Sequence, residues 1–442
     1  MPQLDELIAE ASAALAAIQA AADARRSTLA ALASHRSTLA ASDRIHLFAI
    51  GKASLEMTLA AIEAVGDRID RGLVAAVPEP LSALSADLQS ALARHRVESM
   101  PCDHPLATQR NLDFAAAART FVSAVPANAR LLALISGGGS AHLASPPSDV
   151  SLDDLRRVTG AMLRAGATIG ELNAVRKHVE TLKGGRLAEI CSARVDAFVV
   201  SDVIGDRLDV IASGPFTPDP TTFADALAAL QRRGATRVAP SITAHLTRGT
   251  LGALPETPKP GAGAFDRVRQ TIIAGNSAVV RAAAETLSHA RRGTFREEHQ
   301  VEGTVEAVAE RLVQGVAPGR AVILGGEWAV DVRDSHGVGG PSQELALRAS
   351  VLLEQRGFAE PFACLCYSTD GVDGPTDAAG VIVTGDTLRM ARACGLDPVR
   401  SLREHDSFGF FAALRAGAGS SCEHLRPGPT GTNVNHVAVL LT

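Results

Sequence analysis

Short apolar runs alternate along this chain with longer segments of helical periodicity. The runs are rich in branched residues and end in glycine, serine or aspartate, a pattern typical of buried strands followed by turns. In the first part of the chain they are Ile45–Ile50, Leu73–Val77, Leu131–Ile135 and Asp196–Val200. Helical patterns occupy residues 4–40, 109–125, 152–168, 180–192 and 221–234. This alternation predicts an α/β fold with a doubly wound parallel sheet.

A second group of apolar runs follows a stretch rich in proline and glycine, Leu254–Gly263. These runs predict strands at Thr271–Ala274, Ala321–Leu324, Ala329–Val332, Phe362–Tyr367 and Val437–Leu441. The length of 442 residues also exceeds the usual size of one domain. We therefore expect two domains, residues 1–253 and a smaller α/β domain at residues 264–442, joined by this stretch.

Composition narrows the class of protein. Hydrophobic residues make up 46% of the chain and charged residues 21%, which is ordinary for a globular protein with a sizeable core. A net charge of −5 and 3% aromatic residues give neither a basic surface nor a stacking platform, so we expect no nucleic acid partner. No apolar run reaches membrane-spanning length, so we also expect no membrane association. We expect either a monomer or a homodimer.

The N-terminus and the cysteines indicate the compartment. Acidic residues precede any basic one, so the segment has neither the charge of a signal peptide nor that of a transit peptide. The six cysteines lack metal-binding spacing, and Cys364 and Cys366, two apart on an expected strand, are interpreted as core residues. A reducing cytoplasm is the expected location.

Two aspartates follow the strand at Asp196–Val200. Asp202 and Asp206 lie in a loop with Gly205, at the carboxyl end of a strand, where open α/β sheets bind ligands. Two carboxylates there suit a divalent cation or a phosphate-bearing substrate. The alternative is a solvated turn, in which aspartate and glycine serve the backbone geometry.

Glycine-rich turns follow two other strands. The Ser136–Ser140 loop (Ser-Gly-Gly-Gly-Ser) could direct backbone N–H groups at phosphate oxygens, although it is neither a Walker A sequence nor G-x-G-x-x-G and could be a flexible turn. Lys52 follows the strand at Ile45–Ile50 and could place its ammonium against a phosphate; the alternative is a solvated surface lysine.

Carboxylates also gather between Thr369 and Asp377. Asp370, Asp373 and Asp377 fall within eight positions after an apolar strand, which is electrostatically costly without a cation. A structural calcium loop is the lesser alternative, since the spacing and the terminal glutamate of an EF-hand are missing.

These segments, in this order, resemble the class II glycerate kinases, the glycerate 2-kinases with a C-terminal MOFRL domain. The motifs that carry the resemblance span most of the chain: Gly51–Ser54, His104-Pro105, Ser136–Ser140, Asn173–Arg176, His178, Lys183–Gly185, Ser201–Asp206, Ala212–Pro215, Gly275–Ser277, Gly325–Glu327, Gln343-Glu344, Asp370–Gly380 and Gly428–Asn435. The resemblance implies a Rossmann-like N-terminal domain, a smaller C-terminal α/β domain and an active site in the cleft between them. It also implies phosphorylation of the 2-hydroxyl of D-glycerate, a small hydroxy acid, with ATP and Mg²⁺.

Phosphoryl transfer requires positioned cations and hydrogen-bond donors around the phosphate oxygens, and candidates for these roles occur in the matching motifs. We expect catalytic roles for Lys52, Asp202 and Asp370, and Mg²⁺ ligands at Asp206 and Asp373. Nucleotide or phosphate binding is expected at Ser136, Gly137, Gly138, Gly139, Ser140 and Asn276. Substrate binding is expected at His104, Arg176, Lys183 and Glu327.

The chain departs from the family pattern at several positions. Family members carry two arginines where this chain has Val338 and Pro341, and an arginine there would be a natural partner for a substrate carboxylate. Trp328 stands in place of a small polar residue, and His436 in place of an aspartate. Three hypotheses follow: a glycerate 2-kinase with a rearranged carboxylate clamp, a kinase for another small 2-hydroxy acid, and a non-catalytic nucleotide- or metabolite-binding protein.

Overall fold

The computed structural model describes residues 2–35, 44–76, 86–290, 295–332, 337–418 and 423–442. The chain forms two compact units. The N-terminal unit is Ala24–Ile273, and the C-terminal unit combines Ala274–Thr442 with the first residues of the chain, up to Asp23.

The N-terminal unit is built on a six-stranded sheet. Its order is β3 (Val97–Pro101), β2 (Ile69–Ala76), β1 (Ile45–Ile50), β4 (Arg130–Ile135), β5 (Arg194–Val200) and β6 (Val268–Ala274). The first five strands pair in parallel. This is the strand order of the Rossmann fold, in which the winding reverses between β1 and β4 and ligands bind at the carboxyl ends of these two strands. The predicted fold class of this unit is confirmed.

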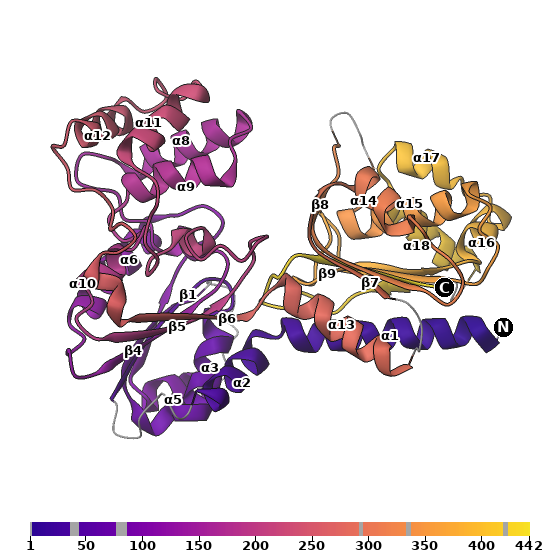
Figure 1. The fold of residues 1–442 in the computed structure, drawn as a ribbon, viewed down its shortest axis with the longest axis horizontal. Coiled ribbons are helices and arrows are strands. Elements are labelled where there is room, and N and C mark those ends of the chain that lie inside the picture. The colour runs from indigo at the N-terminus through magenta and orange to yellow at the C-terminus, as the bar shows by residue number, and fades with distance from the viewer. Residues whose placement is uncertain (1, 36–43, 77–85, 291–294, 333–336, 419–422) are drawn as a thin grey trace. The chain divides into compact units, whose positions relative to one another are not determined.

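Helices in the N-terminal unit form two groups. One accompanies the sheet: α2 (Ala24–Ser34), α3 (Ser54–Val65), α5 (Ala86–Arg94), α6 (Gln109–Ser123), α7 (Gly139–His142) and α10 (Arg186–Ile190), with the 3₁₀ turns η1 (Gly66–Arg68), η2 (Ile211–Ser213) and η3 (Gly263–Arg267). The other group gathers at one end of the unit (Figure 1): α8 (Leu152–Arg164), α9 (Ile169–His178), α11 (Phe223–Arg232) and α12 (Pro240–Thr250). These four helices share an apolar core of their own, which includes Met162 and Leu230.

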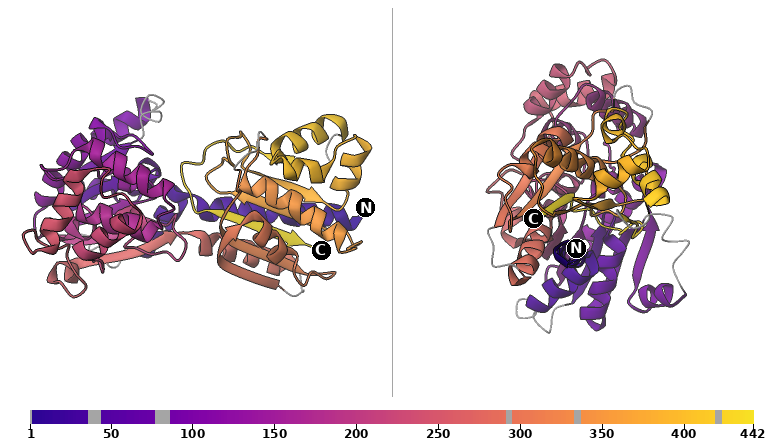
Figure 2. Two further views of the ribbon diagram at one scale, coloured as in Figure 1. Left: turned by 90° about the horizontal axis from the view of Figure 1, so that it is seen from above. Right: turned by 90° about the vertical axis from the view of Figure 1, so that its right-hand side faces the viewer.

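The C-terminal unit holds a six-stranded mixed sheet. Its order is β11 (Glu423–Leu425), β10 (Gly380–Thr384), β9 (Ala363–Ser368), β12 (His436–Leu441), β8 (Ala321–Ala329) and β7 (Phe295–Thr304). Only β7 and β8 pair in parallel. One face carries α14 (Val305–Val313), α15 (Pro341–Gln355), α16 (Thr387–Ala393), α17 (Pro398–Arg403) and α18 (Ser407–Ala418), and the other carries α1 (Pro2–Ala22) and α13 (Asn276–Ala290), as Figures 1 and 2 show.

The boundary between the units differs from the predicted one. The stretch expected to be a linker belongs to the N-terminal unit, where Thr257 is buried and donates a hydrogen bond to Asp219 at 3.0 Å. Strand β6 follows it in the same sheet. Helix α1, at the other end of the sequence, packs on α13 and β9 of the C-terminal unit. The reason is tertiary: α1 buries Leu7, Ala11 and Ile18, and composition does not reveal which sheet covers them.

Strand prediction also needs correction in the C-terminal unit. Ala321–Leu324 and Ala329–Val332 were expected as two strands, but β8 runs without a break from Ala321 to Ala329. The apparent break is Gly325-Gly326, and glycine is required there because a Cβ at Gly326 would lie 1.9 Å from the Val301 carbonyl oxygen. Of the other predictions, Val77 and residues 36–40 lie outside the described residues.

Cys364 and Cys366 are buried side by side on β9, as predicted. Among the described helices, none is by itself long and apolar enough to cross a membrane; the bent pair α1 and α2 would qualify together, by length and composition alone.

Candidate functional site

The turns after β1 and β4 are hydrogen-bonded to each other at the point where the winding of the sheet reverses. The Lys52 N–H donates to the Gly137 carbonyl at 2.8 Å, and the Ala53 N–H donates to the Ser136 hydroxyl at 3.0 Å. Gly51 allows this approach, because its φ is +100° and a Cβ would lie 2.3 Å from the Ser136 carbonyl oxygen. Lys52 and the glycine loop are far apart in sequence but lie next to each other at the carboxyl edge of the sheet. The Lys52 side chain is exposed there.

Asp202 and His104 approach the same glycine loop. A Cβ at Gly137 would lie 2.1 Å from an Asp202 carboxylate oxygen, and one at Gly138 would lie 3.0 Å from the His104 ring and 3.2 Å from Lys52 Cγ. Burial raises the pKa of Asp202, opposed by a backbone hydrogen bond and by the Lys52 ammonium. Burial, reinforced by Lys52, lowers the pKa of His104 to about 4. The structure thus brings together three residues that were predicted separately, and His104 is neutral at pH 7.

His142 is a member of this cluster that the sequence did not indicate. Its Nδ1 accepts a hydrogen bond from the Gly51 N–H at 3.0 Å, so this nitrogen is unprotonated. Burial lowers the pKa of His142 to about 4, with a further contribution from His104, while Asp103 opposes the shift. A neutral imidazole therefore holds the turn that carries Lys52.

Ser213 is a second residue that sequence reasoning missed. Its hydroxyl bridges the Ser140 hydroxyl, at 2.8 Å, and the Asn173 side-chain oxygen, at 3.1 Å. The backbone supports this position with unusual geometry, because Ala212 and Ser213 have φ values of +50° and +59°. Left-handed conformations at such residues cost free energy and are found most often at functional sites. The sequence motif Ala212–Pro215 was recognised, but the strain within it was not visible.

A cavity of about 360 Å³ in the N-terminal unit contains three of the predicted substrate residues, His104, Arg176 and Lys183, together with Gly138 and Ser140 of the glycine loop. The cations on its lining differ in their bonding. Lys183 is buried and donates to the Glu180 carboxylate and to the Leu143 carbonyl. Burial lowers its pKa, and Glu180 opposes that shift. Lys183 therefore holds Glu180 in place at the edge of the cavity.

Arg176 is the cation in this cavity that protein groups leave available. It makes no hydrogen bond or ion pair with any residue in the described part of the chain, and the charge of Glu180 favours its ionised form. Burial lowers the pKa of its guanidinium. A half-buried arginine that no described protein group binds can pair with an incoming carboxylate or phosphate.

Asp373, predicted as a metal ligand, has another task in the structure. Its two carboxylate oxygens accept the N–H groups of Ser342 and Gln343, each at 2.9 Å, and the Gln343 side-chain amide at 3.0 Å. Burial raises its pKa to about 6 against the effect of these donors. Asp373 thus anchors the first turn of α15. A carboxylate in a turn looks the same in sequence whether it binds a cation or backbone N–H groups, and the metal role of Asp373 stays a prediction.

The remaining predicted residues are dispersed. Asp206 is half-buried in the loop after β5, and Asp370 accepts hydrogen bonds from Ser368 and Val372 in the C-terminal unit. Asn276 is buried at the start of α13, where its amide donates to the Val434 and His436 carbonyls, and Glu327 is exposed on β8. Within the described residues, no three histidine, cysteine, aspartate or glutamate side chains form a metal centre.

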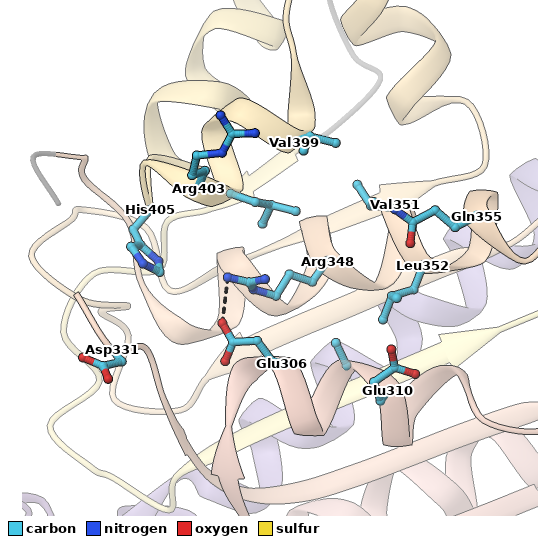
Figure 3. A pocket seen from close by; sticks show the side chains of 12 residues that line it. Glu306, Glu310, Asp331, Arg348, Val351, Leu352, Gln355, Val399, Arg403 and His405 are labelled. Atoms are coloured by element: carbon cyan, nitrogen blue, oxygen red, sulfur yellow. Dashed lines mark ion pairs between the residues drawn. The ribbon is translucent and has the colours of Figure 1, made fainter. Parts of the chain in front are cut away.

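A larger cavity, about 870 Å³, lies in the C-terminal unit (Figure 3). Helices α14, α15 and α17 line it, and an ion pair of 2.7 Å joins Arg348 to Glu306 on its wall. None of the predicted site residues contributes to this lining. We therefore place the functional site at the glycine loop, where Lys52, Asp202 and His104 lie close together, and not at this larger cavity.

Comparison with known proteins gives the relationship. A family described as a domain of unknown function (DUF4147) matches residues 4–247, and the MOFRL family matches residues 320–436. The D-glycerate 2-kinase of Thermotoga maritima is 37% identical over 412 residues, which cover 90% of each chain. The glycerate 2-kinase of Pyrococcus horikoshii is 34% identical over 414 residues, 90% of this chain and 87% of that one.

A solved structure has a similar fold, and another relative carries the name of a different enzyme. The crystal structure of the Thermotoga maritima glycerate kinase is similar with a TM-score of 0.83, at 32% identity, over the whole of both chains. A protein named putative hydroxypyruvate reductase from Agrobacterium vitis is 35% identical over 79% of this chain and 78% of its own length. The resemblance inferred from the motifs is confirmed, and the chain belongs to the glycerate kinase family that carries a MOFRL domain.

Proposed function

We propose that this protein transfers the γ-phosphoryl group of ATP to the 2-hydroxyl of D-glycerate, giving 2-phosphoglycerate. The observation that carries the proposal is the convergence of Lys52, Asp202 and His104 on the glycine loop at the carboxyl ends of β1 and β4. Similarity to glycerate 2-kinases along nearly the whole chain supports it.

Lys52 and Asp202 would share the work of the transfer. The 2-hydroxyl oxygen forms a bond to the γ-phosphorus while the bond from that phosphorus to the β,γ-bridging oxygen breaks, and ADP leaves. Phosphoryl transfer depends mainly on charges positioned around the transferring oxygens, which is the role proposed for Lys52. Asp202 accepts the hydroxyl proton, and a carboxylate whose pKa is raised by burial is a better base than a solvated one.

The glycine loop, Ser136–Ser140, would receive the phosphates through its backbone N–H groups, with Asn276 as the predicted nucleotide contact in the C-terminal unit. Mg²⁺, when bound with ATP, neutralises charge on the phosphate oxygens. The residues present fit such an ion, because Mg²⁺ needs only one or two protein carboxylates and keeps its waters and phosphate ligands. Asp206 lies in the same loop as Asp202 and remains the proposed ligand, whereas the carboxylate of Asp373 is already occupied by N–H groups.

Arg176 would bind the carboxylate of the acceptor. The family's two arginines are absent at Val338 and Pro341, so another cation has to take over the anionic end of the substrate. Arg176 is half-buried on the lining of the cavity that also contains His104 and Ser140, and it makes no hydrogen bond or ion pair within the described chain. Lys183 cannot serve equally well, because Glu180 already neutralises it. Glu327 and Asp370 remain proposed site residues of the C-terminal unit.

An assay with two arms tests the proposal. ADP formation is measured with D-glycerate, ATP and Mg²⁺, and oxidation of NADH or NADPH is measured with hydroxypyruvate. We expect activity in the first arm alone, because the turn after β1 reads Gly51–Ser54 and lacks the G-x-G-x-x-G sequence of dinucleotide sites. Hydroxypyruvate reduction without ADP formation would favour the reductase name. Inactivity in both arms, with nucleotide binding preserved, would favour the non-catalytic hypothesis.

A further inference from the structure

One face of α8 presents apolar side chains to the cavity that contains Arg176. Leu152, Leu155, Thr159 and Leu163 are spaced by three or four residues, which places them in a single stripe along the helix. All four line the cavity. Leu155 is buried, whereas Leu163 is 56% exposed.

The loop after His104 adds a further apolar side chain to this lining. Leu106 is 66% exposed and lines the same cavity. This loop is fixed rather than free, since the Arg156 guanidinium of α8 donates to the Ala107 carbonyl. The apolar lining is thus held in place by a bonded arginine, and Arg176 stays available for a ligand.

The size of the cavity exceeds the need of a three-carbon acid. A volume of about 360 Å³ falls in the range, roughly 300–1,000 Å³, of pockets that enclose drug-sized ligands. D-Glycerate has a carboxylate and two hydroxyls but no apolar group that could cover leucine side chains. Leucines left exposed in a ligand pocket indicate an apolar portion of the ligand.

We propose that the acceptor site admits 2-hydroxy acids with an apolar substituent at C3, whose carboxylate pairs with Arg176 and whose chain covers Leu106 and Leu163. The inference rests on the proposed kinase function, because it assigns the acceptor class of that same site. The reaction is unchanged: the 2-hydroxyl oxygen bonds to the γ-phosphorus of ATP, its proton passes to Asp202, and ADP leaves.

Kinetics with a homologous series test this proposal. D-Lactate, D-2-hydroxybutyrate and D-2-hydroxypentanoate differ only by methylene groups, so the 3-hydroxyl of glycerate does not confound the comparison. Burial of each methylene should raise kcat/KM by about threefold to fourfold. A flat or falling series, with D-glycerate turned over normally, would overturn the inference and leave the proposed function standing.

Leucine variants test whether Leu163 and Leu106 contact the apolar chain of the acid. Leu163→Gln and Leu106→Gln should raise the KM for D-2-hydroxypentanoate by about fivefold more than they raise the KM for D-glycerate, and should change the KM for ATP by less than about twofold. Leu251→Gln is the matched control, since Leu251 is 79% exposed in the same unit and does not line the cavity. A rise in the KM for ATP instead would identify the leucines as a nucleobase site and contradict the proposal.

A binding measurement tests the apolar subsite independently of the proposed kinase function. Calorimetry of D-2-hydroxypentanoate with the wild type and with Leu163→Gln does not depend on turnover. Tighter binding than D-glycerate, weakened by the variant, supports the apolar subsite even if no acid is phosphorylated, in which case the kinase proposal alone fails. Equal binding of both acids to both proteins would reject the subsite.

Discussion

The indole ring of Trp328 stacks on the imidazole of His436, with ring centroids 5.0 Å apart and an interplanar angle of 29°. The two residues stand on neighbouring strands, β8 and β12. At both positions the motif resemblance leads us to expect another residue, a small polar one at Trp328 and an aspartate at His436. Burial lowers the pKa of His436 to about 4, opposed by Asp370, so the stacked ring is neutral at pH 7. The side chains at these two positions therefore pack against each other.

We predict that Trp328 and His436 are energetically coupled. Trp328 is 2% exposed, and an aromatic pair contributes about 0.5–1.5 kcal/mol beyond the area it buries. A double-mutant cycle with Trp328→Ser and His436→Asp should give a coupling free energy of about 1 kcal/mol in urea unfolding followed by circular dichroism. A cycle between Trp328 and His424, which stacks on Phe408 instead, is the control and should give a value near zero. Additive effects of Trp328→Ser and His436→Asp would mean that the two substitutions are unrelated.

Arg176→Gln should raise the KM for the acceptor acid. Removing the partner of a buried carboxylate costs about 2–5 kcal/mol, so an increase of 30-fold or more is expected, with the KM for ATP nearly unchanged. Steady-state kinetics with each substrate varied in turn measures both constants. Arg164→Gln, an exposed arginine of α8 outside the cavity, is the matched control. If the KM for ATP rises while that for the acid does not, Arg176 belongs to the nucleotide side of the site.

Stability should fall as the pH decreases from about 6.5 towards 4, in part because of His142. Its pKa is about 4 in the folded protein and near 6.5 when unfolded, so in this range the unfolded chain binds a proton that the folded protein does not. The stabilisation is complete above pH 6.5 and its loss on acidification amounts to about 3 kcal/mol. His142→Asn keeps an acceptor for the Gly51 N–H and should flatten the pH dependence of urea unfolding between pH 4 and 6.5. An unchanged slope would show that His142 is not neutral in the folded state.

Asp373→Ala should destabilise the protein without changing its dependence on Mg²⁺. The substitution leaves the N–H groups of Ser342 and Gln343 without their acceptor, at a cost of about 1–3 kcal/mol. Thermal unfolding measures the loss, and a titration of activity with Mg²⁺ measures the metal dependence. Asp206→Ala is the comparison, because Asp206 is half-buried and remains the proposed metal ligand. A large shift of the Mg²⁺ midpoint in Asp373→Ala alone would restore the role predicted from sequence.

The sequence predicted most of the buried strands, although it missed β10, which is apolar and fully buried, and it missed the polar edge strands β3 and β7. Runs such as Leu131–Ile135 are apolar because both faces of a central strand are covered. Strand β7 (Phe295–Thr304) lies at the edge of its sheet and carries charged residues along much of its length. It therefore lacks the apolar pattern by which a strand is predicted. Strand β3 is a second polar edge strand that was missed. The boundary between the units could not be predicted for another reason. Helix α1 belongs to the C-terminal unit because it packs on α13 and β9, which are distant in sequence.

In the candidate site, topology explains what was predictable. Lys52, the glycine loop and Asp202 each follow a parallel strand, and the carboxyl ends of such strands meet at one edge of the sheet. His142 and Ser213 act through contacts with Gly51 and Ser140, 91 and 73 residues away in sequence, so local pattern gave no sign of them. The availability of Arg176 is likewise a property of its surroundings, since nothing in the sequence distinguishes it from the bonded Arg156.

The central claim, phosphoryl transfer to the 2-hydroxyl at the site of Lys52, is tested most directly by ³¹P NMR of the reaction products. Purified protein is incubated with ATP, Mg²⁺ and D-glycerate, beside a Lys52→Met variant of unchanged thermal stability. The account predicts ADP and 2-phosphoglycerate in equal amounts from the wild type and a loss of rate of about 10²-fold or more in the variant. The appearance of 3-phosphoglycerate, or equal rates for the two proteins, would contradict it.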